Sequence, residues 1–220
     1  MRKMFISNKD ETARIFKSNW MEVFSKVHPA IPLIIYIPVI FYSLYKSYAN
    51  GLSNYHILTL FLAGITVWTL TEYLLHRFLF HFNFKGDFGQ RLHFIFHGVH
   101  HAYPKDSKRL VMPPSVSIPL AIIFYYLYAY LFGDRYAAPF FAGFIAGYLF
   151  YDMTHYAIHH FDIKSGIFLE IKKHHMKHHY MDSEKGFGVS QPVWDMIYGT
   201  NFNMPDKEKN NNTGMNENIG

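Results

Sequence analysis

Residues 115–160, SVSIPLAIIFYYLYAYLFGDRYAAPFFAGFIAGYLFYDMTHYAIHH, join two long apolar runs to a histidine-rich block. The runs, residues 115–132 and 136–154, are separated by the tripeptide GDR, which is a turn signal. Each has about 20 residues, enough for a helix to cross a hydrocarbon core about 30 Å thick. Gly143 and Gly147 form a G-x-x-x-G pattern, which permits close helix packing. The stretch therefore predicts a transmembrane helical hairpin.

A second pair of apolar runs lies nearer the N-terminus. Residues 29–48 and 52–75 are separated by the tripeptide ANG, and each again has a length that suits a membrane span. Four such runs are hard to bury in a chain of 220 residues, which disfavours a soluble core of buried helices. We therefore expect an all-α integral membrane protein with four transmembrane helices in two hairpins and a cytoplasmic helical cap. The predicted membrane domain covers residues 29–202.

The charge distribution predicts the orientation of these spans. Two hairpins place the N-terminal segment, residues 76–113 and residues 157–220 on one side of the membrane. These segments hold all of the 21 Lys and Arg residues except Lys46 and Arg135. The positive-inside rule then places them in the cytoplasm. We expect a multi-pass protein of the membrane with its active site on the cytoplasmic side and no nucleic-acid partner.

The two ends of the chain predict different structures. In residues 1–28, Phe16, Trp20, Phe24 and Val27 recur at helical spacing and form one apolar stripe. We interpret this segment as a helix at the membrane interface; the alternative is a helix packed on the protein's own aqueous layer. The first residues lack the features of a signal peptide. Residues 203–220 are polar and rich in asparagine, which is typical of a disordered tail.

The candidate metal ligands of this sequence are histidines. The chain has 15 histidines and no cysteine, which excludes disulfides, thiolate zinc sites and cysteine-bound iron–sulfur clusters. Four clusters, HRFLFH, HGVHH, HYAIHH and HMKHH, contain ten histidines at spacings that allow convergence on metal. Their i, i+3 and i+4 pairs can share a helix face, whereas His76 and His81 need a helix end or a break. Ten nitrogen ligands are too many for one ion, so the sequence predicts two.

The ligand type alone leaves the metal open, because imidazole suits zinc, iron, copper and nickel. Five ligands for each of two ions would leave a position for O₂ or water. The carboxylate-bridged di-iron motifs do not occur here. Nearby acids are expected to orient imidazoles through their far N–H groups, or else to form surface salt bridges. These acids are Glu72, Asp106, Asp152, Asp162, Glu170 and Asp182.

The order of these clusters resembles the fatty acid hydroxylase/sterol desaturase superfamily, and in particular the fatty acid 2-hydroxylases. Three stretches carry the second resemblance: EYLLHRFLFHF from Glu72, HAYPKDSKRLVMPP from His101 and FGVSQPVWDMIYGT from Phe187. The resemblance implies an O₂-dependent dimetal centre with iron as the working metal, although zinc can occupy such sites in purified protein. The ligands that it implies are His76, His81, His97, His100, His101, His155, His159, His175, His178 and His179.

The resemblance also implies an activity, which is the hydroxylation of C2 of a fatty acyl chain, either free or in a sphingolipid. Residues 1–28 are too short for the cytochrome b5 domain that eukaryotic relatives usually carry. We therefore expect an external electron donor, a ferredoxin or a cytochrome b5 with its reductase. Lys172, Lys173 and Lys177 are candidates for its docking site. The missing domain also suggests a bacterial source and an inner-membrane location.

Two other functions stay open. One is a different lipid oxidase of the superfamily, acting on a sterol or carotenoid, and the other is a membrane metal transporter or store. Asp152 and Tyr156 lie near His155 and are candidate catalytic residues. Arg109 could bind a polar head group or a lipid phosphate at the interface. A row of tyrosines could line an acyl groove or belong to the core; they are Tyr125, Tyr126, Tyr128 and Tyr130.

Overall fold

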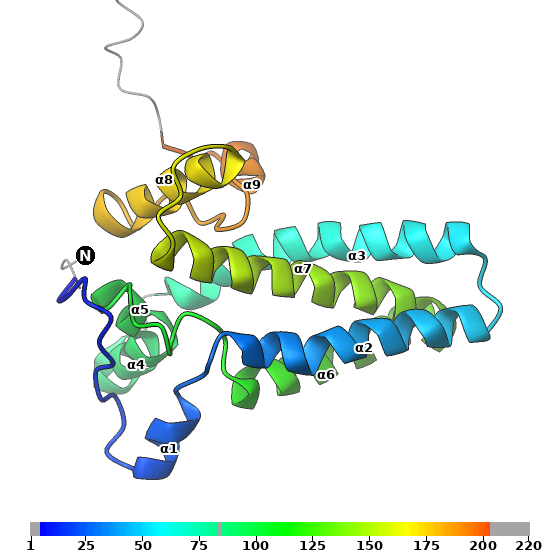
Figure 1. The fold of residues 1–220 in the computed structure, drawn as a ribbon, viewed down its shortest axis with the longest axis horizontal. Coiled ribbons are helices and arrows are strands. Elements are labelled where there is room, and N and C mark those ends of the chain that lie inside the picture. Colours follow the sequence, from blue (N-terminus) through cyan, green and yellow to red (C-terminus); the bar gives the residue numbers. More distant parts are fainter. Residues whose placement is uncertain (1–4, 83–84, 203–220) are drawn as a thin grey trace, which may run out of the picture.

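The computed structural model describes residues 5–82 and 85–202, and every regular element in this part of the chain is helical. Four long helices run side by side, and the shorter helices gather at one end of them (Figure 1). The elements are α1 (Asn19–Phe24), α2 (Ala30–Ala49), α3 (Asn54–Leu75), the π-helix η1 (His76–Phe80), α4 (Gly86–His93), the π-helix η2 (Phe94–Gly98), α5 (Val99–Ala102), α6 (Pro114–Phe132), α7 (Asp134–His160), α8 (Ile167–Tyr180) and α9 (Val193–Ile197).

Helix α7 is the centre of the bundle. It packs against α2, α3 and α6, and most of its side chains are buried. Aromatic rings fill the contact, where Trp68 of α3 meets Phe144 and Tyr148 of α7 edge to face at centroid distances of 5.1 and 5.3 Å. Such pairs stabilise a core beyond the area that they bury. The sides of α2, α3 and α6 that do not pack against α7 form the outer faces of the bundle.

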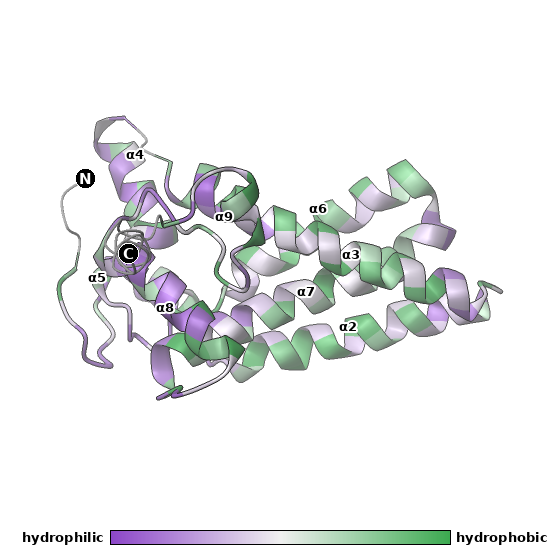
Figure 2. Ribbon diagram, turned by 90° about the horizontal axis from the view of Figure 1, so that it is seen from above, coloured by the Kyte–Doolittle hydropathy of each residue, from purple (hydrophilic) through white to green (hydrophobic). Residues whose placement is uncertain are grey.

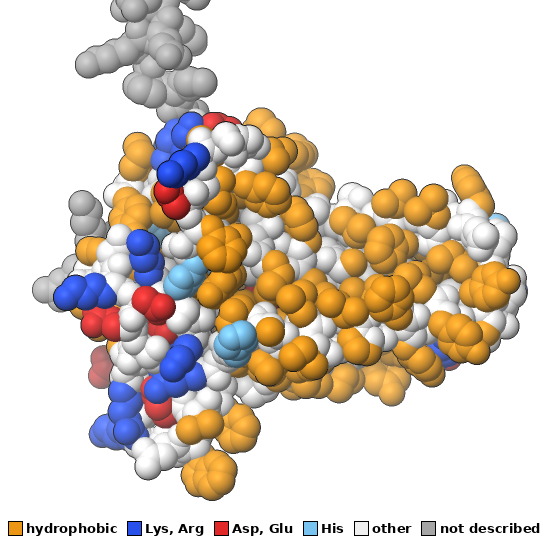
Figure 3. All heavy atoms as spheres, viewed as in Figure 1, with side chains coloured by type: hydrophobic (Ala, Val, Ile, Leu, Met, Phe, Trp, Pro, Cys, Tyr) orange, Lys and Arg blue, Asp and Glu red, His pale blue; other side chains and the backbone are white. Residues whose placement is uncertain are grey.

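Those outer faces are apolar. Hydrophobic side chains cover the bundle, whereas charged side chains collect over the end that carries the short helices (Figure 3). The ribbon coloured by hydropathy is most strongly hydrophilic at the same end (Figure 2). By length and composition, three of the described helices could cross a membrane: Ala30–Ala49, Asn54–Phe80 and Pro114–Phe132. A membrane protein of helical class is therefore confirmed. The predicted fourth span corresponds to α7, whose apolar run contains Asp152 near its end, is followed by histidines and is largely shielded by its neighbours.

The N-terminal segment differs from its predicted form. The apolar stripe predicted a helix from Phe16 to Val27, but α1 has only six residues. Val27 is buried, whereas Trp20 and Phe24 are exposed. Arg109, a candidate for binding a polar head group or a lipid phosphate, is buried in ion pairs with Glu22 and Asp106, because this segment folds back over residues 106–109. The predicted disordered tail, residues 203–220, lies outside the described residues.

The G-x-x-x-G pattern of α7 faces α3, as close packing requires. A Cβ atom at Gly143 would collide with the backbone of Phe61, and a Cβ atom at Gly147 would meet the side chain of Trp68. We expect Gly143→Ala to lower the free energy of unfolding by about 1–3 kcal/mol. Gly147→Ala, its matched control, should have a smaller effect because an indole can shift and a helix backbone cannot. Thermal denaturation in detergent measures both, and equal melting temperatures would contradict this packing.

Candidate metal centre

The four histidine clusters meet at one end of the bundle. The described ring nitrogens form two groups, and within each group one nitrogen per residue lies within 4.8 Å of the others. Group one comprises His76, His81, His97, His101 and His178, and group two comprises His100, His155, His159, His175 and His179. The two groups are adjacent, since the rings of His101 and His179 stack across them at 4.2 Å. All ten histidines that the sequence indicated therefore come together.

Helical spacing explains most of this arrangement. Group one contains one i, i+4 pair and group two contains two, and the members of each pair lie on one helix face. In both H-x-x-H-H blocks, however, one member faces the other group. His100 belongs to group two, although His97 and His101 belong to group one. His178 belongs to group one, although His175 and His179 belong to group two. A block therefore serves both groups, a division that the spacing alone did not indicate.

A π-helical turn brings His76 and His81 together. The backbone N–H of His81 donates to the carbonyl of His76 at 3.1 Å, which closes an i→i+5 turn at the end of η1. Five residues make about one turn in this geometry, so both imidazoles point to the same side, with their Nε2 atoms 3.2 Å apart. The sequence predicted a helix end or a break at this place. The structure confirms the helix end, because the helix that begins at Asn54 ends with His81 as its C-cap, and its last turn is widened into a π-helix.

The nitrogen positions fit metal ions. In group one, Nε2 of His178 lies 3.0 Å from Nε2 of His81, and Nε2 of His97 lies 3.0 Å from that of His101. In group two, the His155–His100 and His175–His159 Nε2 pairs are 2.9 and 3.0 Å apart. Two ligand nitrogens at right angles, each about 2.1 Å from an ion, are about 3.0 Å apart. The lone pairs of unprotonated nitrogens repel at this distance unless a cation lies between them, so the donor set fits two ions.

Backbone carbonyls fix the orientation of three of the rings. The Nδ1 atoms of His76, His155 and His178 lie 2.6, 3.2 and 2.7 Å from the carbonyl oxygens of Phe187, Leu110 and Lys185 respectively. An Nδ1–H that donates to a carbonyl leaves Nε2 as a free lone pair. These three Nε2 atoms are the ones that face the other histidines. The tautomer that can bind metal is therefore set by the backbone.

Buried carboxylates hold the segments that supply these carbonyls. Asp195 accepts the N–H groups of Phe187 and Gly188 at 2.8 and 2.7 Å, together with the Thr200 hydroxyl and the His174 ring. Asp195 is fully buried. Burial alone would raise the pKa of Asp195, but these donors outweigh it and hold the pKa below its usual value. An ionised carboxylate therefore fixes the loop on which His76 and His178 depend.

Two further carboxylates act in the same way. Glu72 accepts the N–H groups of Val189 and Ser190 at 2.8 and 2.7 Å, and the Ser190 hydroxyl at 2.5 Å. Asp152 accepts the Met112 N–H at 3.3 Å and the Tyr148 hydroxyl at 3.0 Å, two residues from the carbonyl that orients His155. We expected both acids to contact imidazoles. They act on the backbone instead, and Asp195 was missed because it lies outside every histidine cluster.

The remaining acids lie elsewhere, and their predicted contact with imidazoles was wrong. Asp162, Glu170 and Asp182 form ion pairs with nearby lysines, as the alternative held. Asp106 pairs with Arg109. Three further histidines lie near the two groups: His174 contacts Asp195, and the Nε2 atoms of His93 and His160 are buried without a hydrogen-bond partner among the described residues.

The electrostatics of both groups favour metal binding. Burial, together with neighbouring imidazoles, lowers the pKa of His81 to about 2, and burial lowers that of His178 to about 4. Burial likewise holds the pKa of His100, His101 and His179 well below the usual value. The rings are therefore neutral at pH 7, which is the form that binds metal.

An apolar cavity of about 440 Å³ reaches both groups. Its wall includes His97 of group one, and His100 and His155 of group two. Asp152 also lies in this wall. Tyr156 stacks on His160 at 4.7 Å and is not part of the wall. The four tyrosines of α6 do not line it either; Tyr126 and Tyr130, for example, are 68% and 88% exposed on the outer face of the bundle.

Comparisons with known proteins identify the family. The sequence model described as fatty acid hydroxylase matches residues 61–200. A dihydroceramide fatty acyl 2-hydroxylase of Arabidopsis thaliana is 38% identical over 191 residues, which cover 86% of this chain and 80% of that protein. A fatty acid 2-hydroxylase of Homo sapiens is 36% identical, with 85% of this chain and 56% of that protein covered. A solved structure of full-length scs7p, in which only the hydroxylase domain is visible, matches with a TM-score of 0.78 at 36% identity, covering 84% of this chain and 70% of that chain. The resemblance read from the histidine clusters is thus confirmed, and the chain belongs to the fatty acid hydroxylase family.

Proposed function

We propose that this protein is a membrane monooxygenase that hydroxylates C2 of a fatty acyl chain, either free or in a sphingolipid. The observation that carries the proposal is the apolar cavity, which ends on histidines of both groups. A cavity of about 440 Å³ lies in the usual range for a ligand pocket, and its lining suits a hydrocarbon chain. The names of the relatives support the choice of substrate.

Groups one and two would each hold one ion, with the ten histidines as ligands. Two iron ions, or zinc in purified protein, are the expected occupants. Bound iron would supply the activation of O₂, with one oxygen atom entering the C–H bond and the other leaving as water after uptake of two electrons and two protons. Five histidines for each ion leave room for a further ligand.

The protein's own residues would position the acyl chain and keep water from it. The apolar wall of the cavity excludes water around the reacting carbon. Asp152 is the predicted catalytic residue that lies in this wall, where Tyr148 and the backbone of Met112 hold it. It is therefore our candidate for contact with the polar end of the substrate. Tyr156 stays a weaker candidate because it is turned toward His160.

We infer that α7 also crosses the membrane, because it is 27 residues long and runs beside three helices that could cross it. Four spans would place the histidine groups on the side that carries most of the lysines and arginines, which is the cytoplasmic side. Location in a bacterial inner membrane stays a prediction.

Lipid analysis tests the proposed function. The chain would be expressed in cells that contain no 2-hydroxy lipids, and their fatty acids would be released and analysed by mass spectrometry. We expect 2-hydroxy fatty acids only in cells that express the chain. Hydroxylated sterols or carotenoids instead, or metal accumulation without any hydroxylated lipid, would contradict the proposal and favour the two alternatives.

Catalysis should depend on a second protein. Each hydroxylation consumes two electrons, and we expect a separate protein to supply them. Purified protein with O₂ and substrate alone should therefore complete at most about one turnover, and a ferredoxin or cytochrome b5 with its reductase should restore many. Lys173 and Lys177 are exposed on α8 and could contact the donor, so turnover should weaken with added salt. Sustained turnover with NADPH alone would contradict this prediction.

A further inference from the structure

The cavity has a wall that does not belong to the helix bundle. Part of it is made by the N-terminal segment, through Phe16, Trp20, Met21 and Phe24. The opposite side is formed by η2 and by the start of α6. An acyl chain that reaches the histidines must therefore lie against α1.

The same helix exposes apolar side chains on its outer surface. Trp20, Val23 and Phe24 are 77%, 64% and 61% exposed. At 100° per residue these three lie within about 100° of one another, on the face opposite Glu22. Glu22 itself is only 6% exposed. A cluster of exposed apolar side chains of this kind usually marks a contact with a membrane or with another protein.

The position of α1 favours a membrane contact. The span α2 begins at Ala30, six residues after Phe24, so an extended connection could cover at most about 20 Å. In Figure 1, α1 lies beside the end of the bundle that carries the short helices, and hydrophobic side chains project there in Figure 3. Lys17, which is exposed just before the helix, suits a lipid phosphate group.

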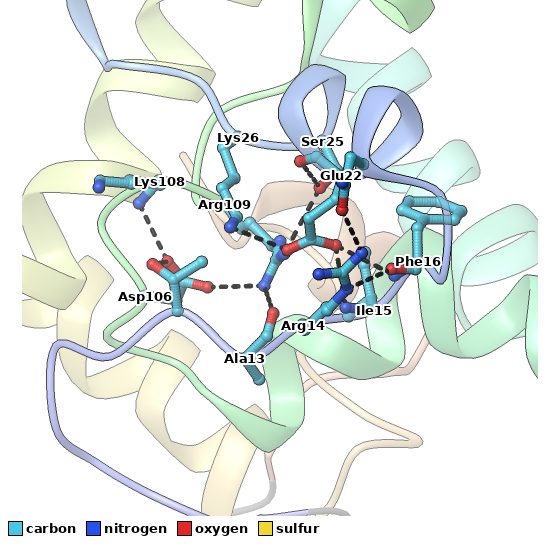
Figure 4. A network of polar contacts seen from close by, with 12 residues as sticks. Ala13, Arg14, Ile15, Phe16, Glu22, Ser25, Lys26, Asp106, Lys108 and Arg109 are labelled. Atoms are coloured by element: carbon cyan, nitrogen blue, oxygen red, sulfur yellow. Dashed lines mark hydrogen bonds and ion pairs between the residues drawn. The ribbon is translucent and has the colours of Figure 1, made fainter.

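A buried ion-pair network fixes α1 in this position (Figure 4). Glu22 accepts from Arg109 at 2.7 Å and pairs with Lys26 at 2.9 Å, while the backbone N–H groups of Ile15 and Phe16 donate to its second oxygen. Arg109 also pairs with Asp106 and donates to the carbonyl of Ala13. Breaking one partner of a buried pair leaves an uncompensated charge, so such a network specifies one arrangement. The next residue, Leu110, carries the carbonyl that contacts His155.

We propose that α1 is embedded in the membrane interface and forms the entrance of the acyl cavity, so that a bilayer lipid inserts its chain between Trp20, Met21 and Phe24 without crossing water. This inference rests on the proposed function for the identity of the chain. It adds the route from the bilayer and the segment that forms it. The occupant of the exposed face of α1 is the lipid surface itself.

The absence of cysteine makes the position of α1 directly measurable. A nitroxide would be attached to a single cysteine in Val23→Cys, with the protein in phospholipid vesicles. We expect collisions with O₂ to exceed those with a polar nickel chelate, as for Leu62→Cys on the outer face of α3. Lys164→Cys, 80% exposed between α7 and α8, should show the reverse. A label at residue 23 that behaves like the one at residue 164 would overturn the proposal.

Substrate delivery provides the second test. Val23→Asp places a charge on the outer face of α1, and Val23 does not line the cavity. For long-chain lipids in vesicles, kcat/KM should fall about tenfold, which corresponds to about 1.4 kcal/mol, while short, water-soluble acyl substrates should react as before. Ile197→Asp on α9, where Ile197 is 61% exposed, is the matched control and should change neither value.

The two proposals fail differently. Absence of 2-hydroxy products from the unaltered protein would refute the proposed function, and the nitroxide measurement would still report where α1 lies. If Val23→Asp changed kcat/KM equally for both kinds of substrate, or for neither, the proposal that α1 forms the entrance would be overturned.

Discussion

Replacing His159 with alanine is expected to lower hydroxylation by at least about a thousandfold, because loss of a metal ligand removes about 4 kcal/mol or more of transition-state stabilisation. His159 belongs to group two, where its Nε2 lies 3.0 Å from that of His175. Elemental analysis should show the metal content falling from two ions per chain toward one, since the five histidines of group one are unchanged. Membrane insertion should persist, because α7 is held by its contacts with α2, α3 and α6.

His160→Ala is the matched control, as the adjacent imidazole stacks on Tyr156 and belongs to neither group. This variant should keep both ions and most of the activity. Hydroxylation by His159→Ala at the rate of the unaltered protein would show that His159 is not a ligand. A starting content of one ion per chain would refute the two-ion arrangement as a whole.

The long helices could be predicted from the sequence because their limits are changes of composition. The predicted run 52–75 corresponds to the helix Asn54–Leu75, and the predicted run 115–132 corresponds to the helix Pro114–Phe132. The run 136–154 extends to His160, since its polar end is buried against other polar groups rather than exposed to water. The N-terminal helix was predicted too long. Its local pattern could not reveal that Glu22 pairs with Arg109, 87 positions away in the sequence.

The metal centre was predictable where it depends on helical spacing. The i, i+4 pairs in His97–His101, His155–His159 and His175–His179 each stay within one group. The assignment of His100 and His178 to opposite groups depends on how helices pack, which spacing does not encode. The π-turn at His76 is likewise a response to its surroundings, and no residue in HRFLFH requires it.

The carboxylates show why residue type and sequence position alone do not predict which groups they contact. An acid near a histidine in sequence suggests a direct hydrogen bond, and Asp152 fits that pattern. In the structure it contacts the backbone of Met112, and the orienting atom is a carbonyl two residues away. Backbone acceptors carry no sequence signal, so the contribution of Asp195 could be found only from the fold.

Replacing Asp195 with asparagine is expected to weaken metal binding in group one by about 10–100-fold, the usual effect of losing a group that orients a ligand. Each carboxylate oxygen accepts two hydrogen bonds, Oδ1 from Phe187 and Thr200, and Oδ2 from Gly188 and His174. An NH₂ group in either place would face the backbone N–H of Phe187 or of Gly188, donor against donor, at a cost of about 1–3 kcal/mol for the group left unsatisfied. The Phe187 and Lys185 carbonyls then lose their fixed positions against His76 and His178.

Added metal distinguishes this positioning role from a general loss of folding. Titration of the metal-free Asp195→Asn protein should show one site of nearly normal affinity and one weakened site, and activity should recover at high metal concentration. A protein that is merely less stable would not regain activity in this way. Asp182→Asn is the matched control, because Asp182 lies near the same loop but is only half-buried, pairs with the side chain of Lys185 at 3.8 Å and accepts a single backbone N–H, that of Glu184, at 3.0 Å. It should bind both ions normally. Equal weakening of both sites in Asp195→Asn would show that the loop does not act on group one alone, since group two takes its backbone contact from Leu110 instead.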